Sequence, residues 1–165
     1  MNINRSTSQG VGHKTTTMIS IREATSEDSQ KIISFQLAMA KETEELELNK
    51  EVLSAGVKTV FEKQLKGRYF VAEAEGSVVA SLLITYEWSD WRNKDVWWFQ
   101  SVYVVPEYRR KGIFRMMYEY VKEEAVKNGI AGLRLYVESN NLPAMKTYEA
   151  MGMSSEHYTM YEWLR

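Results

Sequence analysis

The chain has 165 residues, of which 44% are hydrophobic and 26% are charged, the size and composition of a single globular domain with its own core. Its 21 basic residues nearly balance its 22 acidic ones, and the formal net charge of -1 argues against a general nucleic-acid or membrane partner. The absence of cysteine excludes disulfides, thiolate nucleophiles and cysteine metal sites, and two distant histidines give no zinc cluster, so no metal is expected.

The N-terminal segment has almost nothing to bury in a core. Residues 1–17 are rich in Ser, Thr, Asn and Gly, and we expect a flexible leader there, followed by a single domain over residues 18–165. No apolar run approaches the roughly 20 residues of a membrane span, and the N-terminus lacks the apolar segment of a secretory signal. A cytoplasmic location is therefore expected.

From residue 18 onward, extended and helical patterns alternate along the chain. The first helix has Thr25 as a candidate N-cap with Asp28 three residues on, and the second helix ends at Gly67. Hairpin-linked strands in the middle and helix-linked strands afterwards predict an α/β (mixed α+β) fold with a mixed sheet covered by helices. The predicted strands are 18–24, 68–76, 78–88, 96–105, 132–138 and 154–164, and the predicted helices are 25–42, 49–67, 113–125 and 141–152.

The stretch SVYVVPEYRRKGIFRMMYEYV, residues 101–121, places a basic cluster where a strand turns into a helix. The amides of a helix's first turn have no partners within the helix, and the helix dipole adds positive charge there, so this position suits a phosphate. Arg109, Arg110 and Lys111 add full charges, and Gly112 permits close approach of the backbone. The alternative is a solvated basic turn, since neither G-x-x-x-x-G-K-[ST] nor a G-x-G-x-x-G after a strand is present.

The segments VYVVPEYRRKGIF and NNLPAMKTYEAMGM resemble the two signature segments of the GNAT superfamily of acetyl-coenzyme A dependent N-acetyltransferases, and the resemblance covers residues 18–165. It implies a three-layer fold with a central, largely antiparallel twisted sheet that is splayed between strands four and five. In the family motif [RQ]-x-x-G-x-[GA], helix amides hold the coenzyme A pyrophosphate. The corresponding residues here are Arg109, Arg110, Lys111, Gly112, Ile113 and Phe114. Phe114 departs from the motif, and its side chain either faces inward or crowds the phosphates.

The second segment keeps the family spacing of Asn141, Ala144 and Tyr148. The resemblance implies that Tyr148 protonates or hydrogen-bonds the departing thiolate and that Asn141 contributes to cofactor binding. The alternatives are a tyrosine that only packs on a helix face and an asparagine that only caps a helix. The resemblance also implies that the backbone of Val102 to Val104, including Tyr103, binds the pantetheine arm as another strand would, with one amide polarising the thioester carbonyl.

The catalytic base is not evident from the sequence. A primary amine is mostly protonated at neutral pH, so a proton must leave before the nitrogen attacks. Many relatives carry Glu or Asp on strand four for this step, whereas this chain has Gln100 and Ser101 at that place. We expect Gln100 to orient a water or the substrate, with the base coming from elsewhere or from solvent.

Two further features are candidates for the acceptor site. Glu42 and Glu44 belong to an acidic run, KETEELELN, that either attracts a cationic amine or forms a solvated face. Trp88 and Trp91 lie in a tryptophan-rich loop that is similar to the arrangement in diamine and polyamine acetyltransferases, and they are candidates for a wall over the acceptor. Trp97 and Trp98 should point to opposite faces of a strand, so at least one should be in the core.

These observations together predict an N-acetyltransferase that uses acetyl-CoA as cosubstrate. It would move the acetyl group to a primary amine of a small molecule by direct transfer in a ternary complex, because the chain has no cysteine to carry an acetyl group. The alternative is a catalytically silent acyl-CoA sensor or interaction module. The expected partner is the small-molecule amine, with no nucleic acid and no membrane, and the family analogy favours a homodimer.

Overall fold

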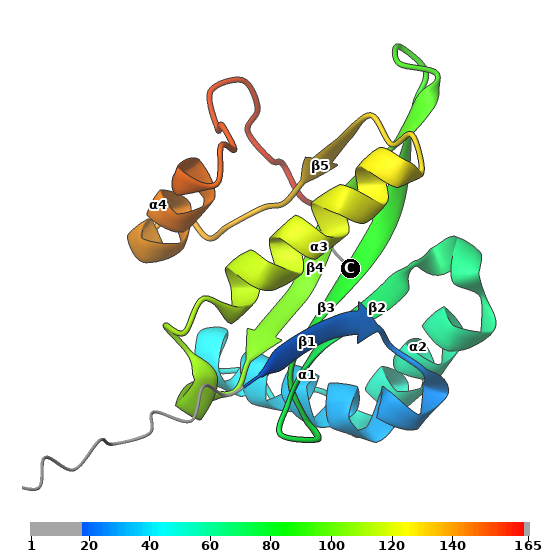
Figure 1. The fold of residues 1–165 in the computed structure, drawn as a ribbon, viewed down its shortest axis with the longest axis vertical. Helices are drawn as coiled ribbons and strands as arrows, with labels where there is room; N and C mark the ends of the chain where they lie inside the picture. Colours follow the sequence, from blue (N-terminus) through cyan, green and yellow to red (C-terminus); the bar gives the residue numbers. More distant parts are fainter. Residues whose placement is uncertain (1–17, 164–165) are drawn as a thin grey trace, which may run out of the picture.

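The computed structural model describes residues 18–163, so the predicted leader lies outside the described part. Its elements follow one another as Figure 1 shows. They are β1 (Ile19–Glu23), η1 (Ser26–Asp28), α1 (Ser29–Thr43), α2 (Lys50–Glu62), η2 (Gln64–Lys66), β2 (Arg68–Ala74), β3 (Ser77–Ser89), β4 (Lys94–Val104), η3 (Pro106–Tyr108), α3 (Ile113–Lys127), β5 (Gly132–Arg134) and α4 (Leu142–Ala150). Within residues 18–163, no helix combines the length and the apolar character needed to span a membrane.

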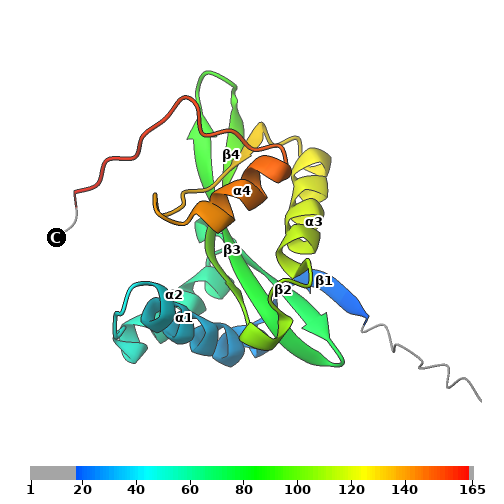
Figure 2. The same cartoon turned by 90° about the vertical axis from the view of Figure 1, so that its left-hand side faces the viewer.

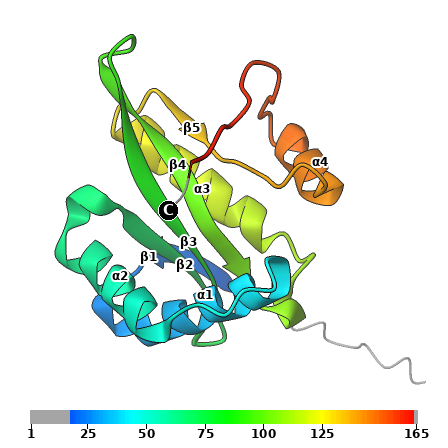
Figure 3. The ribbon, with the colours of Figure 1, turned by 180° about the vertical axis from the view of Figure 1, so that it is seen from behind.

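The sheet is mixed and largely antiparallel, as the sequence predicted. Its strand order is β1-β2-β3-β4-β5, and every neighbouring pair is antiparallel except β4 and β5. Helices α1 and α2 cover one face and α3 covers the other, which gives three layers (Figure 2). The long β3–β4 hairpin extends beyond the part of the sheet that α1 and α2 cover (Figure 3).

The alternation of side chains along the strands divides the interior into two cores. On β2, Phe70 and Ala72 pack with Met117 and Val121 of α3. The alternate residues Tyr69 and Val71 pack on the opposite face, in the cluster that holds residues of α1 and α2. The sheet is therefore buried on both faces at its centre, which fixes its position between the helices.

The splay between β4 and β5 is visible in their pairing. The ladder joins only Val96–Trp98 to Gly132–Arg134. In the described part of the chain, the rest of β4 faces no strand on that side. A bulge lies in this C-terminal half of β4. Ser81 pairs with Tyr103 and Leu83 pairs with Gln100, so β4 has one more residue than β3 between these two pairs. Ser101, at the bulge, has a φ of 50°. Bulges bend a strand and end regular pairing, so this one opens the edge of β4 beside the predicted site.

Two predicted strands need correction. The predicted closing strand over 154–164 does not form within its described residues 154–163, where Tyr158 and Tyr161 are 81% and 92% exposed. Its aromatic residues have β propensity, which alone cannot create a pairing partner. The predicted strand over 132–138 pairs only as far as Arg134, because the chain then leaves β4.

The helix boundaries follow local rules. The predicted Thr25 and Asp28 pair forms at the start of η1, where the Thr25 amide donates to the Asp28 carboxylate at 2.8 Å. The helix predicted over 49–67 ends as α2 at Glu62, and the turn of η2 leads to Gly67. A Cβ atom on Gly67 would lie 2.5 Å from the carbonyl oxygen of Ile84, so glycine is required where the chain enters β2.

Candidate active site

The N-terminus of α3 has no side-chain cap. Gly112 is the N-cap residue, with a φ of 79°, and it has no side chain to accept a hydrogen bond from the first turn. In contrast, Asn49 caps α2, with its side chain accepting from two amides at 2.9 and 3.1 Å, and Asn141 caps α4 by accepting from Ala144 at 3.2 Å. A Cβ atom on Gly112 would meet nothing within 4 Å. The first-turn amides of α3 are thus accessible and suited to an anion.

The basic residues before Gly112 differ from one another in their contacts. Arg110 and Lys111 are exposed, and the Lys111 Nζ lies 4.7 Å from the ring centre of Tyr108. Arg109 is held in place: its Nε donates to the carbonyl of Val104 at 2.9 Å and its guanidinium pairs with Glu42 at 2.6 Å. Arg110 and Lys111 are therefore the cations of this turn that have no acidic partner among the described residues.

Glu42 lies against the predicted cofactor residues. One carboxylate oxygen pairs with Arg109, and the other accepts from the hydroxyl of Tyr103 at 2.9 Å. The Arg109 guanidinium and the Tyr103 hydroxyl hold the pKa of Glu42 below its usual range. Glu44, two residues on, is exposed at the end of α1. The structure thus separates the two glutamates that the acidic run had grouped, and no local pattern predicts a contact between residues 67 positions apart.

The structure decides between the two orientations of Phe114. Its ring lies 6.3 Å from Phe99, 6.5 Å from Tyr118 and 5.7 Å from Tyr148, and it packs against the core beneath α3. The preceding Ile113 is only 2% exposed. Phe114 therefore faces inward, and only its backbone amide is on the anion side of the turn.

Tyr148 meets this aromatic cluster from α4. Its ring contacts Phe114 edge-on, at an interplanar angle of 72°, and the side chain is half-buried. Burial raises the pKa of its hydroxyl above the ordinary value of 10.0. Tyr148 is thus protonated at neutral pH, which is the state that a proton donor needs. Asn141, at the start of the same helix, has the capping role that the sequence left open.

The bulge of β4 is held from the side of α1. Ser101 has its carbonyl 3.5 Å from the side-chain nitrogen of Gln36, which is only 5% exposed. The neighbouring Gln100 accepts a hydrogen bond from the hydroxyl of Tyr136 at 2.6 Å. Sequence reasoning missed Gln36 and Tyr136, because each lies far along the chain from its partner. No carboxylate stands at Gln100 or Ser101.

Comparison with known proteins identifies the family. The profile of the Acetyltransferase (GNAT) family matches residues 34–153. The chain belongs to the GNAT family. It is 30% identical over 142 residues to the thialysine N-epsilon-acetyltransferase of Bos taurus, across 81% of this chain and 83% of that protein.

Two solved structures show the same fold. A possible acetyltransferase from Clostridium difficile 630 superposes with a TM-score of 0.82 at 47% identity, covering 89% of this chain and 97% of that one. A predicted acetyltransferase from Clostridium acetobutylicum, solved with acetyl-CoA, superposes with a TM-score of 0.69 at 21% identity, covering 90% and 95%. The chain is thus a GNAT acetyltransferase with acetyl-CoA as cosubstrate, and the open N-terminus of α3 fits the pyrophosphate of that molecule.

The tryptophans predicted for this acetyltransferase lie apart from the glutamates. Trp88 and Trp91, which are 60% and 89% exposed, lie at the tip of the β3–β4 hairpin. That tip and the end of α1 are at opposite ends of the molecule (Figure 3). Trp97 is buried in the core on the α3 side, and Trp98 is half-buried on the opposite face, as the alternation predicted. The structure therefore does not bring Trp88 and Trp91 together with Glu42 and Glu44.

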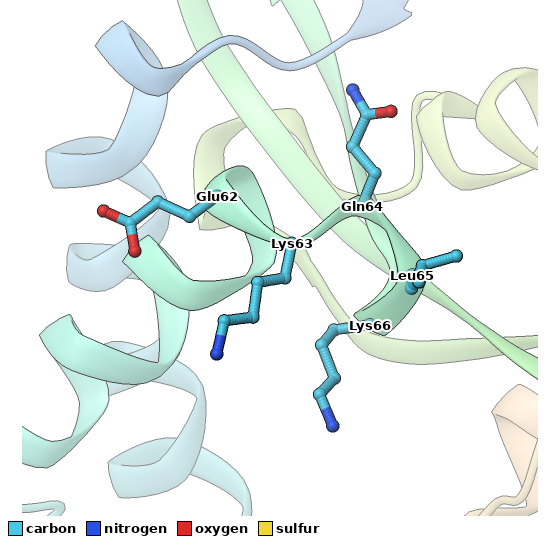
Figure 4. A pocket seen from close by; sticks show the side chains of 5 residues that line it. All are labelled: Glu62, Lys63, Gln64, Leu65 and Lys66. Atoms are coloured by element: carbon cyan, nitrogen blue, oxygen red, sulfur yellow. The ribbon is translucent and has the colours of Figure 1, made fainter.

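A hollow at the end of α2 is separate from this site. Its lining comes from five consecutive residues, Glu62, Lys63, Gln64, Leu65 and Lys66, whose side chains point in different directions (Figure 4). None of them belongs to the predicted site. Among residues 18–163, no group of His, Cys, Asp and Glu is arranged to hold a metal ion.

Proposed function

We propose that this GNAT acetyltransferase moves the acetyl group of acetyl-CoA to a primary amine of a small molecule, by direct transfer in a ternary complex. The observation that carries the proposal is the open edge of β4, which leads from the bulge at Ser101 to the uncapped N-terminus of α3. Acetyl-CoA supplies an activated acyl group at this edge. The name of the Bos taurus relative, which specifies an ε-amine, supports a small-molecule amine as acceptor.

We propose that acetyl-CoA is bound by backbone groups more than by side chains. The amides from Arg110 to Phe114 would bind the pyrophosphate, with Arg110 and Lys111 adding charge. The edge of β4 at Val102, Tyr103 and Val104 would bind the pantetheine arm. The carbonyl of Val104 already accepts from Arg109, so the groups left for the arm are those nearer the bulge.

Tyr148 is proposed as the proton donor to the departing thiolate. Its hydroxyl is half-buried and protonated, and among residues 18–163 it has no hydrogen-bond partner. An unpartnered, protonated hydroxyl beside the start of α3 suits proton transfer to a leaving group. Asn141 orients this residue indirectly, because it fixes the first turn of α4.

We place the acceptor amine beside Gln100, on the face of β4 opposite α3. The glutamine is held by Tyr136 and has no basic character at neutral pH, so the proton of the amine must pass to solvent or to another group. Consequently, kcat/KM should rise with pH towards the pKa of the amine. The two ends of this face hold Glu42 with Glu44 and Trp88 with Trp91. These residues would influence how the amine approaches the site more than they would contact the bound amine.

The absence of cysteine supports the proposal of direct transfer. The chain has no cysteine, so no acetyl-cysteine can form. A homodimer and a cytoplasmic location remain predictions of the family resemblance.

The test is an initial-rate study of the purified chain with acetyl-CoA and a panel of amines. The panel contains amino acids, diamines, polyamines and aminoglycosides, and the readout is release of coenzyme A. We expect at least one amine to be acetylated, with intersecting double-reciprocal lines. Tight binding of acetyl-CoA without transfer to any amine would instead favour the silent sensor, and parallel lines would exclude direct transfer.

A further inference from the structure

A contiguous set of polar and aromatic side chains lies on β3, β4, β5 and the segment that follows β5, on the face opposite α3. We call it the head-group cluster; its members are Glu87, Trp98, Arg134 and Tyr136. Trp98 donates from its indole Nε1 to one oxygen of Glu87 at 2.6 Å, and Arg134 donates to the other oxygen at 2.6 Å. The Arg134 guanidinium lies 5.8 Å from the Trp98 ring. The cluster is therefore an ion pair that lies against an aromatic ring.

The cluster continues directly from the proposed position of the amine. Tyr136 joins the two, because its hydroxyl bonds to Gln100 at 2.6 Å and its ring lies 6.3 Å from the ring of Trp98. Trp98 and Arg134 are register partners in the β4–β5 ladder, so their side chains leave the same face of the sheet. The pyrophosphate turn, Phe114 and Tyr148 lie on the other side, which leaves this face to the acceptor.

The cluster is accessible. The side chains of Arg134 and Glu87 are 30% and 40% exposed, although both form short ion-pair contacts. Helices α1 and α2 cover the lower part of this face and leave the upper part of the hairpin uncovered (Figure 3). Tyr158 of the C-terminal segment contacts the cluster: its ring lies 5.6 Å from the Arg134 guanidinium and is itself 81% exposed.

We infer that Arg134 and Glu87 bind the α-amino-acid head group of the acceptor, its carboxylate on Arg134 and its α-ammonium on Glu87. This inference rests on the proposed function and names the substrate class of that same site. The acceptor is then a lysine-like amino acid, whose distal amine reaches Gln100 while its methylene chain lies over Trp98 and Tyr136.

Charge balance is the main reason for choosing a zwitterion. When an amino acid binds, its carboxylate replaces Glu87 as the partner of Arg134, and its ammonium replaces Arg134 as the partner of Glu87. Every charge therefore keeps a partner of opposite sign. A diamine or polyamine brings only positive charge. Its ammonium groups would be repelled by Arg134. They would also have to compete for Glu87, because Trp98 and Arg134 already contact both of its oxygens. The cluster thus favours an amino acid over a polyamine.

The dimensions agree with this assignment. Gln100 and Trp98 are two residues apart on one strand, a separation of about 7 Å. A side chain with four methylene groups places its amine roughly 6 Å from the α-carbon, given carbon–carbon bonds of about 1.5 Å. The Arg134 guanidinium is also a planar donor that matches a carboxylate with two parallel hydrogen bonds.

The experiment compares L-lysine with cadaverine, which has the same chain and both terminal amines but no carboxylate. We expect the wild type to show a kcat/KM for lysine at least roughly tenfold above that for cadaverine. Arg134→Gln should reduce kcat/KM for lysine about tenfold or more, mainly by raising the KM for lysine. The same variant should change kcat/KM for cadaverine less than about threefold. Lys66→Gln, which also removes one positive charge at an exposed turn but lies apart from this site, is the control and should change neither.

A binding measurement separates this inference from the proposed function. Calorimetry of lysine with the chain saturated in coenzyme A requires no turnover. Lysine binding that Arg134→Gln weakens would support the subsite even if no amine is acetylated, a result that would contradict only the proposed function. The inference is overturned if lysine does not bind the wild type, or if the lysine-to-cadaverine ratio is unchanged in Arg134→Gln. Should that variant fail to fold, Arg134→Lys keeps the charge but loses the paired donors, and must lower the same ratio.

Discussion

An arginine–glutamate ion pair lies beside each end of β4, and the two pairs differ in their surroundings. Near its C-terminal end, Arg109 pairs with Glu42 at 2.6 Å, and its guanidinium lies 5.4 Å from the ring of Tyr103. Arg134 and Glu87 form the corresponding pair near its N-terminal end, at 2.6 Å, over the ring of Trp98. In both pairs the second glutamate oxygen accepts a hydrogen bond from the aromatic residue.

The difference lies in what each pair joins. Glu42 connects the end of α1 to the loop before α3, and so it holds Arg109 beside an uncapped helix terminus. Glu87 and Arg134 both stand on the sheet, on the upper part of the face whose lower part α1 and α2 cover. An anionic ligand at the first end needs the arginine and competes with the glutamate, whereas a zwitterion at the second end uses both charges. Under the two proposals, the same kind of contact would serve an anion site at one end and a head-group site at the other.

The largest effect should come from a residue that belongs to neither pair. Tyr148→Phe removes only a hydroxyl, and it should lower kcat about 10²-fold while the affinities for acetyl-CoA and for the amine change little. Because burial raises the pKa of this hydroxyl, its deprotonation should lower wild-type turnover only at a higher pH than the deprotonation of an exposed tyrosine would. A kcat near that of the wild type would return Tyr148 to a packing role.

A substitution at the start of α3 should affect the first end alone. Gly112→Glu places a carboxylate where the pyrophosphate is expected, and it should weaken acetyl-CoA binding by roughly tenfold or more, about 1.4 kcal/mol. Gly129→Glu is the matched control: Gly129 also has a positive φ, 66°, and open space for a Cβ atom, but it lies at the other end of α3. Calorimetry showing equal affinities in the two folded variants would contradict the phosphate assignment.

The smallest effect should come from Glu42→Gln. Loss of this carboxylate leaves Arg109 uncompensated, so acetyl-CoA binding should become about two- to fivefold tighter, the scale of an exposed ion pair. The gain should shrink at 1 M salt, where the Debye length falls to about 3 Å. Glu44→Gln, without a partner in the described chain, should show no change. Weaker binding in Glu42→Gln would mean that the glutamate orients Arg109 for the phosphate.

The sequence predicted those features that local chemistry determines. The uncapped start of α3 follows from Gly112 itself, the cap of α4 follows from Asn141, and the opposite placements of Trp97 and Trp98 follow from strand alternation. The family resemblance added the order of the layers and the splay of β4 from β5. Each of these depends on residues close together in the chain or on a motif of fixed spacing.

The remaining features depend on long-range contacts. Glu42 was grouped with Glu44 by adjacency, although its partners Arg109 and Tyr103 are more than 60 positions away. Gln36 and Tyr136 carry no motif and acquire their contacts only when β4 is placed. The closing strand was wrong for the same reason, because residues with β propensity do not specify the neighbouring edge with which they would pair.

The most direct test of the two-ended site is an initial-rate matrix in which acetyl-CoA and lysine are both varied, for the wild type, Arg109→Gln and Arg134→Gln. The account predicts that Arg109→Gln raises the KM for acetyl-CoA about three- to tenfold and leaves that for lysine unchanged, and that Arg134→Gln does the reverse. If both variants raise the KM of the same substrate, or if Arg134→Gln affects acetyl-CoA alone, the two ends of β4 do not serve two different ligands.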